Sequence, residues 1–329
     1  MEMQTLVEGF PAQLDEALRI GKAASLSNPS QPVRNVLISG LGGSGIGGTI
    51  VAELAFGSAP VPVTVTKGYF IPAFVDQHTL VIISSYSGNT EETLACMEQA
   101  IAKNAKVVCI TSGGKVAEIA KEKKLDHILI PGGMPPRACF GYSFVQQVFV
   151  FVKYGLLPAS AINELEASAQ LLRDEQVSIR KEAQETASLL HGRMPVIYCT
   201  TNYEGVAIRF RQQLNENSKV LCWHHVIPEM NHNELVGWAG GTEETAVVLF
   251  RDPQEYERND YRISINKDII TKQTPHFTEV FAKGNSAIEK SIYLVHFGDW
   301  VSVYLASLRG VDAVEVNVIN FLKGELSKK

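Results

Sequence analysis

The segment Val81–Thr93, with the sequence VIISSYSGNTEET, constrains the fold more than any other part of the chain. Val81–Ile83 form a short apolar run that is typical of a buried strand, and apolar residues recur at helical spacing beyond the segment. Asn89 and Glu92 have the spacing of a capping box, in which two side chains satisfy the first free N–H groups of a helix. The chain is therefore predicted to turn from strand to helix at Gly88.

Hydroxyl groups gather at this turn, on Ser84, Ser85, Ser87 and Thr90. The start of a helix offers unpaired backbone N–H groups and the positive end of the helix dipole, so such a turn can bind a phosphate dianion. The turn contains no cationic side chain. This favours a phosphate that is held and not transferred, because transfer normally requires lysine and Mg²⁺. The alternative is a helix start with ordinary polar turn residues and no ligand.

Length and composition limit the class of protein. The chain has 329 residues, 45% of them hydrophobic and 20% charged, so two globular domains are expected. The net charge of −5 gives no electrostatic reason to expect nucleic acid or an anionic membrane as partner. The five cysteines form no CxxC pair, and the N-terminus lacks the features of a signal peptide. No apolar run is long enough to span a bilayer. These features predict a cytoplasmic protein with neither a nucleic-acid nor a membrane partner.

Strand-like and helical segments alternate in the first half. The predicted strands are Asn35–Ser39, Val61–Thr66, Leu80–Ser84, Lys106–Thr111 and His127–Ile130. The predicted helices are Thr5–Ala24, Thr49–Phe56, Glu91–Lys103, Val116–Lys123 and Tyr142–Leu157. Strands that alternate with helices indicate a parallel sheet with helices on both faces.

The second half follows a similar plan. A helix-rich connection covers Ala161–His191, and strands are predicted at Val196–Thr200, Val220–Trp223, Thr245–Phe250, Arg262–Ile265 and Phe277–Phe281. Helices are predicted at Tyr203–Glu216 and Ser286–Leu308. The predicted fold class is α/β, with two doubly wound, flavodoxin-like parallel-sheet domains. The expected organisation is an N-terminal helical arm at residues 1–30, a phosphate-binding domain at 31–158, and a second domain with C-terminal helices at 159–329.

The glycine-rich segment Gly40–Gly48, GLGGSGIGG, contains a GxGxxG pattern between a predicted strand and a predicted helix. A dinucleotide-binding fold also needs an acidic residue at the end of the second strand, but Val61–Thr66 runs directly into Lys67. NAD is therefore not expected, although Lys67 leaves an NADP-dependent enzyme open. The loop is better explained by close backbone contact with a small phosphorylated ligand held at Ser85–Thr90.

Three further residues are candidates for acid–base or electrostatic roles. Glu216 ends a predicted helix, where the negative end of the dipole makes a carboxylate a better proton acceptor, although an exposed structural glutamate is the alternative. His232 lies in a polar turn between Pro228 and Gly237, so it is a candidate acid or base. Arg137 follows two prolines near the carboxyl edge of the first sheet, and its alternative role is a surface salt bridge.

A catalytic metal is not expected. His224 and His225 lie close in sequence to His232 and Glu234, but adjacent histidines point in different directions and no HExxH pattern is present.

Five motifs, in this order and spacing, resemble the bifunctional phosphoglucose/phosphomannose isomerases, which are built from two sugar-isomerase (SIS) domains. The motifs are GLGGSGIGG, SSYSGNTEET, PPRACFGY, RFRQQLNENSK and PEMNHNELVGW. The resemblance implies that the sugar phosphate is bound by Gly43, Ser44, Ser85, Ser87 and Thr90. It also implies that Glu216 moves a proton between C1 and C2, that Arg137 stabilises the enediolate, and that His232 opens the sugar ring.

The resemblance implies further features. Lys323, in the C-terminal FLKGEL segment, is similar to a family lysine that assists ring opening. Members of the family are homodimers in which the residue equivalent to His232 comes from the neighbouring subunit. Neither a cofactor nor a metal is required.

The expected activity is therefore the metal-independent interconversion of glucose 6-phosphate or mannose 6-phosphate with fructose 6-phosphate through a cis-enediol(ate). Two alternatives remain open. One is a non-catalytic regulator that binds a sugar phosphate and does not need Glu216 or His232. The other is an enzyme that isomerises or deaminates an amino-sugar phosphate.

Overall fold

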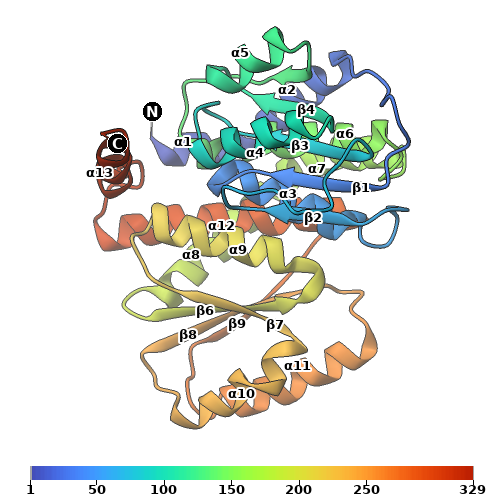
Figure 1. Cartoon of the computed structure of the whole chain (residues 1–329). Coiled ribbons are helices and arrows are strands. Elements are labelled where there is room, and N and C mark those ends of the chain that lie inside the picture. The colour runs from blue at the N-terminus through green and yellow to red at the C-terminus, as the bar shows by residue number, and fades with distance from the viewer. Residues whose placement is uncertain (1, 329) are drawn as a thin grey trace.

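A computed structural model of the protein describes residues 2–328 and contains two parallel β-sheets, one in each half of the chain (Figure 1). The first sheet has the order β2-β1-β3-β4-β5, and its strands are β1 (Asn35–Ser39), β2 (Val63–Thr66), β3 (Thr79–Ser84), β4 (Lys106–Thr111) and β5 (Asp126–Leu129). The second has the order β7-β6-β8-β9, and its strands are β6 (Met194–Thr200), β7 (Trp223–Ile227), β8 (Thr245–Arg251) and β9 (Phe277–Phe281). All neighbouring strands are parallel, which confirms the predicted fold class.

Helices cover both faces of each sheet. Those of the first half are α1 (Met3–Glu8), α2 (Phe10–Ala23), α3 (Gly42–Ala55), α4 (Glu91–Ala102), α5 (Gly114–Glu122), the 3-10 helix η1 (Pro136–Cys139) and α6 (Phe140–Lys153). Those of the second half are α7 (Ser160–Asp174), α8 (Gln176–Leu190), η2 (Thr201–Tyr203), α9 (Glu204–Glu216), η3 (Glu229–His232), α10 (Glu234–Gly237), η4 (Trp238–Gly240), α11 (Glu257–Ile270), α12 (Ala287–Arg309) and α13 (Asn317–Leu326). None of the helices described is long and apolar enough to cross a membrane.

The strand predicted at Arg262–Ile265 is wrong, because these residues lie inside α11. Ile263 and Ile270 are buried two turns apart on one face of the helix, whereas Ile265 is exposed. The apolar residues of this segment therefore follow the period of a helix, which four residues are too few to reveal.

The strand predicted at Val220–Trp223 is also misplaced, since β7 begins only at Trp223. Lys219 has a left-handed φ of +57°, and the N–H of Val220 donates to the carbonyl of Leu214 at 3.2 Å. These residues close the C-terminus of α9 with a left-handed residue and a backbone hydrogen bond instead of pairing in the sheet.

Two helix boundaries differ from the prediction because of glycine. The helix predicted to start at Thr49 starts at Gly42, since an added Cβ at Gly45 would lie 2.2 Å from the carbonyl oxygen of Gly40. Close packing against the end of β1 thus compensates for the low helix propensity of these glycines. The N-terminal helix predicted as one piece is divided into α1 and α2 at Gly9.

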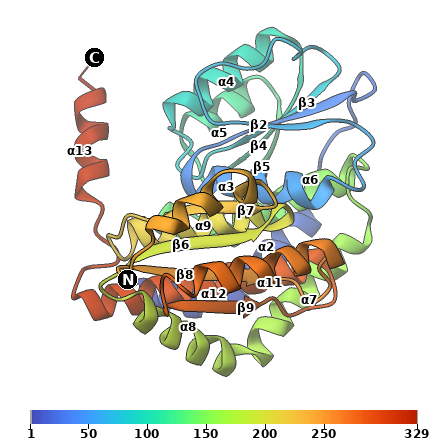
Figure 2. The same ribbon diagram turned by 90° about the horizontal axis from the view of Figure 1, so that it is seen from below.

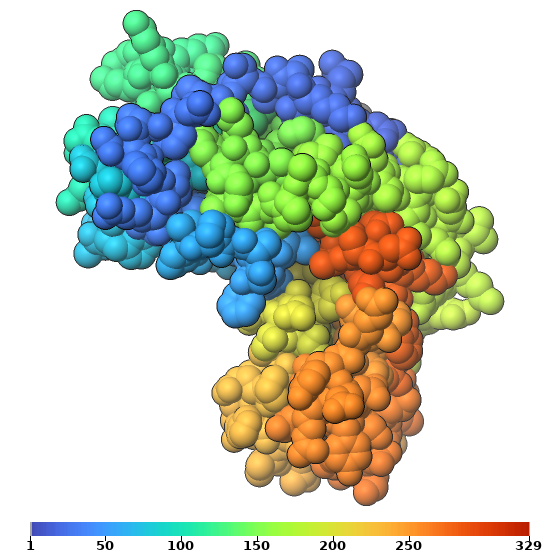
Figure 3. Space-filling model, turned by 90° about the vertical axis from the view of Figure 1, so that its right-hand side faces the viewer, coloured from blue at the N-terminus to red at the C-terminus, as the bar shows by residue number. Residues whose placement is uncertain are grey.

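One continuous apolar core lies between the two sheets and includes residues of α3, α6, α8, α9 and α12 (Figure 1). Smaller clusters lie on the outer faces, under α4 and α5 in the first half and under α11 in the second. Figure 3 shows part of the second half of the chain, in yellow and orange, projecting from a broader body. Because Phe10 and Leu14 of α2 belong to the central core, the N-terminal helices pack with both halves. The boundaries predicted at residues 30 and 158 stay predictions.

A buried carboxyl group lies at the junction of the halves. One oxygen of Glu53, on α3, accepts the N–H of Gly205 in the first turn of α9 at 2.7 Å. The other is buried without a hydrogen-bond partner among the described residues. Burial raises the pKa of Glu53 from 4.5 to about 8, and the hydrogen bond from Gly205 opposes this only in part.

Glu53→Gln is expected to change how stability depends on pH. Between pH 4.5 and about 8, Glu53 is protonated in the folded chain and ionised in the unfolded chain. The folded state then binds more protons, so stability falls as pH rises through this range, by about 3 kcal/mol after allowance for residual solvation. Glutamine keeps an acceptor for Gly205 and removes the charge, so the variant should be more stable than the parent near pH 8 and similar near pH 4. Urea unfolding across this range measures the difference. Glu98→Gln, on the exposed face of α4, is the control. Parallel pH profiles for parent and Glu53→Gln would contradict the prediction.

Candidate active site

The hydroxyl-rich turn joins β3 to α4 as predicted, but its capping differs. Thr90 is the N-cap residue of α4, and no side chain caps the helix there. The expected capping box is wrong, because the side-chain oxygen of Asn89 accepts the N–H of Lys115 at 3.1 Å. The hydroxyls of Ser85 and Thr90 lie 3.0 Å apart, while Ser87 is exposed. The first N–H groups of α4 thus lack a side-chain acceptor beside three hydroxyls, an arrangement suited to an anion.

The glycine-rich segment lies against this turn, because β1 and β3 are neighbours in the sheet. The hydroxyl of Ser44, in the first turn of α3, accepts the N–H of Tyr86 at 2.9 Å. The hydroxyl of Ser84 donates to the carbonyl of Ser44 at 3.0 Å. An added Cβ at Gly40 would lie 2.7 Å from the carbonyl oxygen of Ser84. The two strand ends therefore pack together into one surface, and its role in binding a phosphorylated ligand stays a prediction.

Arg137 lies next to this surface, in η1. A Cβ added to Gly43 would lie 2.9 Å from the carbonyl oxygen of Pro136 and 3.0 Å from the Cα of Arg137. This close approach needs glycine at position 43. It brings the backbone of Arg137 against the first turn of α3.

The guanidinium of Arg137 is buried, so the alternative of a surface salt bridge is wrong. Its Nε donates to the side-chain oxygen of Asn217 at 2.6 Å, and its Nη1 donates to Oε2 of Glu216 at 3.4 Å. Its Nη2 donates to the carbonyls of Ala313 and Val314 at 2.6 and 3.1 Å. Residues from three distant parts of the chain thus meet at one cation, and Glu216 is among them.

Glu216 is more exposed to solvent than the cation with which it pairs. The side chain of Glu216 is 27% exposed, whereas that of Arg137 is 4% exposed. Burial lowers the pKa of Arg137, and the carboxylates of Glu216 and Asp312 partly offset this. Lys219 donates to the carbonyls of Glu216 and Glu315 at 2.5 and 2.7 Å, and burial lowers its pKa also. A cation thus closes the negative end of α9 beside a carboxylate that solvent can reach.

Sequence reasoning missed Asn217 and Lys219 at this site. Both belong to the polar run Asn217–Lys219 that directly follows Glu216, a signal that could have drawn attention to them. Sequence alone could not reveal the contribution of Ala313 and Val314, because their backbone carbonyls make the contacts.

His232 lies apart from Glu216 within one chain. Glu216 ends α9 shortly before β7 begins, whereas His232 lies in η3 after β7 ends. A strand of five residues is about 16 Å long, so the two side chains lie at opposite ends of the second sheet. His232 is exposed. Lys323 is exposed on α13, which extends away from the body of the molecule (Figure 2).

The histidines near His232 have separate partners. His224 lies 3.8 Å from a carboxylate oxygen of Glu204, and burial lowers its pKa to about 4. A ring nitrogen of His225 accepts the N–H of Val226 at 2.8 Å. Residues 2–328 contain no group of three or more histidine, cysteine or acidic side chains placed to hold a metal ion.

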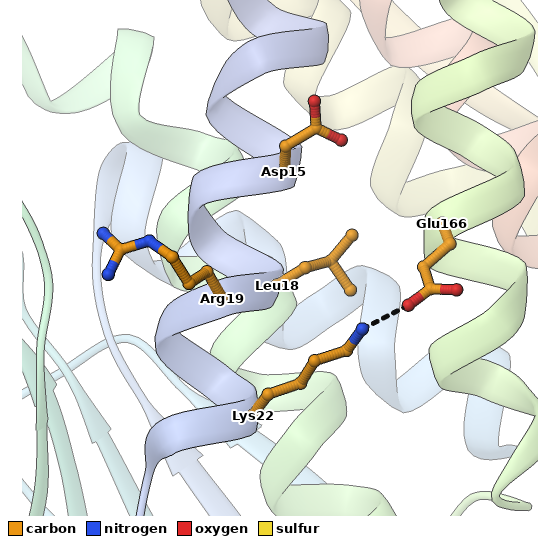
Figure 4. A pocket seen from close by; sticks show the side chains of 5 residues that line it. All are labelled: Asp15, Leu18, Arg19, Lys22 and Glu166. Atoms are coloured by element: carbon orange, nitrogen blue, oxygen red, sulfur yellow. Dashed lines mark hydrogen bonds and ion pairs between the residues drawn. The ribbon is translucent and has the colours of Figure 1, made fainter.

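A surface pocket of about 430 Å³ lies between α2 and α7, and Figure 4 shows the residues that line it, which are Asp15, Leu18, Arg19, Lys22 and Glu166. Lys22 is paired with Glu166 across it. None of the predicted site residues lines this pocket.

Comparison with protein families assigns both halves of the chain to one domain type. The SIS domain family matches residues 33–152, and the family described as bacterial phospho-glucose isomerase C-terminal SIS domain matches residues 179–326. A putative phosphosugar isomerase from Clostridium difficile has the same fold, with a TM-score of 0.78 and 14% identity over 96% of this chain and 95% of that chain. Fold and site thus define a protein built from two SIS domains.

Curated relatives identify the family within that class. The bifunctional phosphoglucose/phosphomannose isomerase of Caldicellulosiruptor bescii is 37% identical over 98% of this chain and 98% of its own length. The enzyme of the same name from Aquifex aeolicus is 36% identical over 99% of both chains. The chain belongs to the family of bifunctional phosphoglucose/phosphomannose isomerases, which confirms the resemblance seen in its motifs.

Gly43→Ala is expected to displace the Arg137 loop. The added Cβ would meet backbone atoms of η1 at 2.9–3.0 Å, and backbone cannot rotate away as a flexible side chain can. Overpacking of this kind should lower the free energy of unfolding by about 1–3 kcal/mol, measured by denaturant titration. Gly57→Ala is the matched control, because nothing lies within 4 Å of its added Cβ. Equal free energies of unfolding for the two variants would show that η1 can move without loss of stability.

Proposed function

We propose that the chain interconverts glucose 6-phosphate or mannose 6-phosphate with fructose 6-phosphate by metal-independent proton transfer through a cis-enediol(ate). The observation that carries the proposal is the position of Glu216. It is a partly exposed carboxylate, paired with the buried cation Arg137. Arg137 in turn lies against the hydroxyl-lined strand ends through Gly43. The names of the relatives supply the substrates.

In this mechanism the phosphate is a handle. Gly43, Ser44, Ser85, Ser87 and Thr90 bind it with neutral donors and with the N-terminus of α4. The phosphate does not react, and its binding energy places C1 and C2 of the open sugar beside Glu216.

Glu216 then removes the proton from C2 of the aldose and returns it to C1, while a hydroxyl proton moves from O2 to O1, which gives the ketose. Negative charge develops on the sugar oxygens in the enediolate, and Arg137 stabilises it electrostatically. A guanidinium carries five N–H groups. Four of those on Arg137 have acceptors in the structure, which leaves one on Nη1, next to Glu216, for a substrate oxygen.

Ring opening needs a second acid–base group, and His232 and Lys323 are proposed for it in a homodimer. The position of His232, at the far end of the second sheet from Glu216, supports its donation to the neighbouring subunit. α13 supports a dimer too, because Val318, Phe321 and Leu322 are 82%, 69% and 57% exposed and no residue of this helix is buried. Large apolar side chains gathered on one projecting helix are typical of an interface.

Free cysteines support the proposed location in the cytoplasm. All five cysteines are unpaired in the structure, which fits a reducing compartment.

An amino-sugar phosphate is the second candidate substrate. The D-glucosamine-6-phosphate 4-epimerase of Sulfolobus acidocaldarius is 33% identical over 60% of this chain. A coupled assay of glucose 6-phosphate, mannose 6-phosphate and glucosamine 6-phosphate, each with and without EDTA, separates the candidates. Turnover of the first two that resists EDTA supports the proposal, and binding without turnover would indicate a regulator.

Glu216→Gln should abolish turnover. The amide keeps the size and a hydrogen-bonding oxygen but cannot accept the substrate proton, so kcat should fall by at least about 100-fold. Binding of a non-reacting analogue such as sorbitol 6-phosphate should change little, because the phosphate-binding residues are untouched. The coupled assay and calorimetry measure the two effects. Retained activity would remove Glu216 as the base.

Mixing two inactive variants tests the shared site. In a twofold dimer, a chain with Glu216→Gln still offers His232 to its partner, and a chain with His232→Ala still provides Glu216. Random mixing should therefore restore about a quarter of the parent activity, since half of the dimers are mixed and each holds one complete site. Absence of any recovery in mixtures that contain heterodimers would place both residues in the same chain's site.

A further inference from the structure

A buried ion pair lies directly behind Arg137. Nη2 of Arg209, on α9, donates to Oδ2 of Asp299, on α12, at 2.6 Å. Nε2 of Gln213 donates to the other oxygen of Asp299 at 2.9 Å, so both carboxylate oxygens have donors. The side chains of Arg209 and Asp299 are 3% and 6% exposed, and the guanidinium lies 4.4 Å from the ring centre of Phe140.

The ion pair contacts the backbone of Arg137. Nη2 of Arg209 also donates to the carbonyl of Arg137, at 3.2 Å. Arg137 belongs to the short helix η1 and not to a sheet, so hydrogen bonds of this kind fix its position.

A second chain of hydrogen bonds leads from Asp299 to the side chain of Arg137. The hydroxyl of Ser302 donates to the carbonyl of Asp299 at 2.7 Å and accepts from the amide of Asn217 at 2.9 Å. The oxygen of Asn217 accepts from Nε of Arg137 at 2.6 Å. Asn217 is the neighbour of Glu216 in the chain. This second chain of hydrogen bonds begins at a backbone carbonyl of α12, so it depends on the helix and not on the carboxylate of Asp299.

α12 is a firm anchor for both chains of hydrogen bonds. It has 23 residues, is buried over most of its length, and lies between the two sheets (Figure 1). Burial raises the pKa of Asp299, and the charge of Arg209 opposes that effect. A buried ion pair of this kind is often no more stabilising than apolar residues of the same volume, so stability alone does not account for it.

We propose that Asp299 is a positioning residue for the reaction, which acts through Arg209 to hold Arg137 in place beside Glu216. The inference rests on the proposed function. Its physical basis is that proton transfer requires the base and the stabilising cation to be placed together, and a misplacement of about 1 Å can lower the rate by about 100-fold.

Asp299→Asn tests the proposal with little change of shape. It removes the charge that orients Arg209, so kcat should fall by about tenfold or more while KM for the hexose 6-phosphates stays within about threefold. The matched control is Asp252→Asn. Asp252 pairs with Lys290, also on α12, at 2.7 Å, and both side chains are largely buried. The control should lose comparable stability and keep its kcat. Equal kcat in the two variants would overturn the proposal.

The double variant Arg209→Met with Asp299→Leu distinguishes an effect on the position of Arg137 from an effect on the stability of the fold. Apolar residues can replace a buried ion pair without loss of stability, so unfolding should return toward the parent value. The carbonyl of Arg137 would still lack its donor, and kcat should remain low. Recovery of kcat together with stability would show a merely structural role. If the double variant does not fold, the comparison of Asp299→Asn with Asp252→Asn decides.

Ligand binding gives a readout that does not depend on turnover. 5-Phosphoarabinonate carries a carboxylate where the enediolate oxygens form, whereas sorbitol 6-phosphate is saturated there. Asp299→Asn should weaken binding of the first by about tenfold and leave the second nearly unchanged. Equal effects on both ligands would overturn the proposal. If the parent isomerises and binds neither hexose phosphates nor these analogues, the proposed function fails, and the positioning role fails with it. If the parent turns over the hexose phosphates normally and Asp299→Asn has the same kcat and ligand binding as the parent, only the positioning role fails.

Discussion

The buried guanidinium of Arg137 is the constraint on which the site depends. Removal of a cation from water costs several kcal/mol unless acceptors replace the water. Arg137 comes from the first half of the chain, but Asn217, Glu216 and the carbonyls of Ala313 and Val314 come from the second. The acceptors can be present only when both halves and the segment after α12 are folded together. The site is thus a product of the whole chain, although each half has its own sheet.

Binding and chemistry occupy different parts of this site in the proposed mechanism. The phosphate-binding surface is made within the first half, because β1 and β3 are neighbours and their carboxyl ends meet. Its donors are hydroxyls and the backbone N–H groups at the start of α4, and none of them carries a charge. The reacting groups lie at the junction, where α9 ends at Glu216 and Lys219 contacts the last carbonyls. The two parts meet at the contact between Gly43 and Arg137, so changes in that contact affect how the bound phosphate places the reacting carbons.

Local sequence patterns predicted the order of strands and helices along the chain. They did not predict which residues far apart in the sequence contact one another. The turn at Ser85–Thr90 was predicted because strand, hydroxyls and helix follow one another within a few residues. The capping role of Asn89 failed because its side chain bonds to Lys115, far away in sequence, and tertiary contact prevailed over local preference. Burial of Arg137 and its pairing with Glu216 were beyond sequence reasoning, since no periodicity marks a cation that is buried by residues from another domain.

The second sheet differs from the first in which of its ends lies near the candidate site. Ligands of parallel α/β sheets normally bind at the carboxyl ends of the strands, as proposed for the first sheet. At the second sheet, that edge is occupied by ion pairs of its own, since Arg251 contacts Glu255 and Glu279 while Asp252 contacts Lys290. The second half therefore contributes to the candidate site of its own chain at the opposite end of the sheet, through the C-terminus of α9. His232 is exposed in η3, beyond the carboxyl end of β7 in the same sheet. The proposed twofold dimer would use both ends of each second sheet, one for each active site, and would bring the proposed base Glu216 of one chain together with the proposed ring-opening residue His232 of the other.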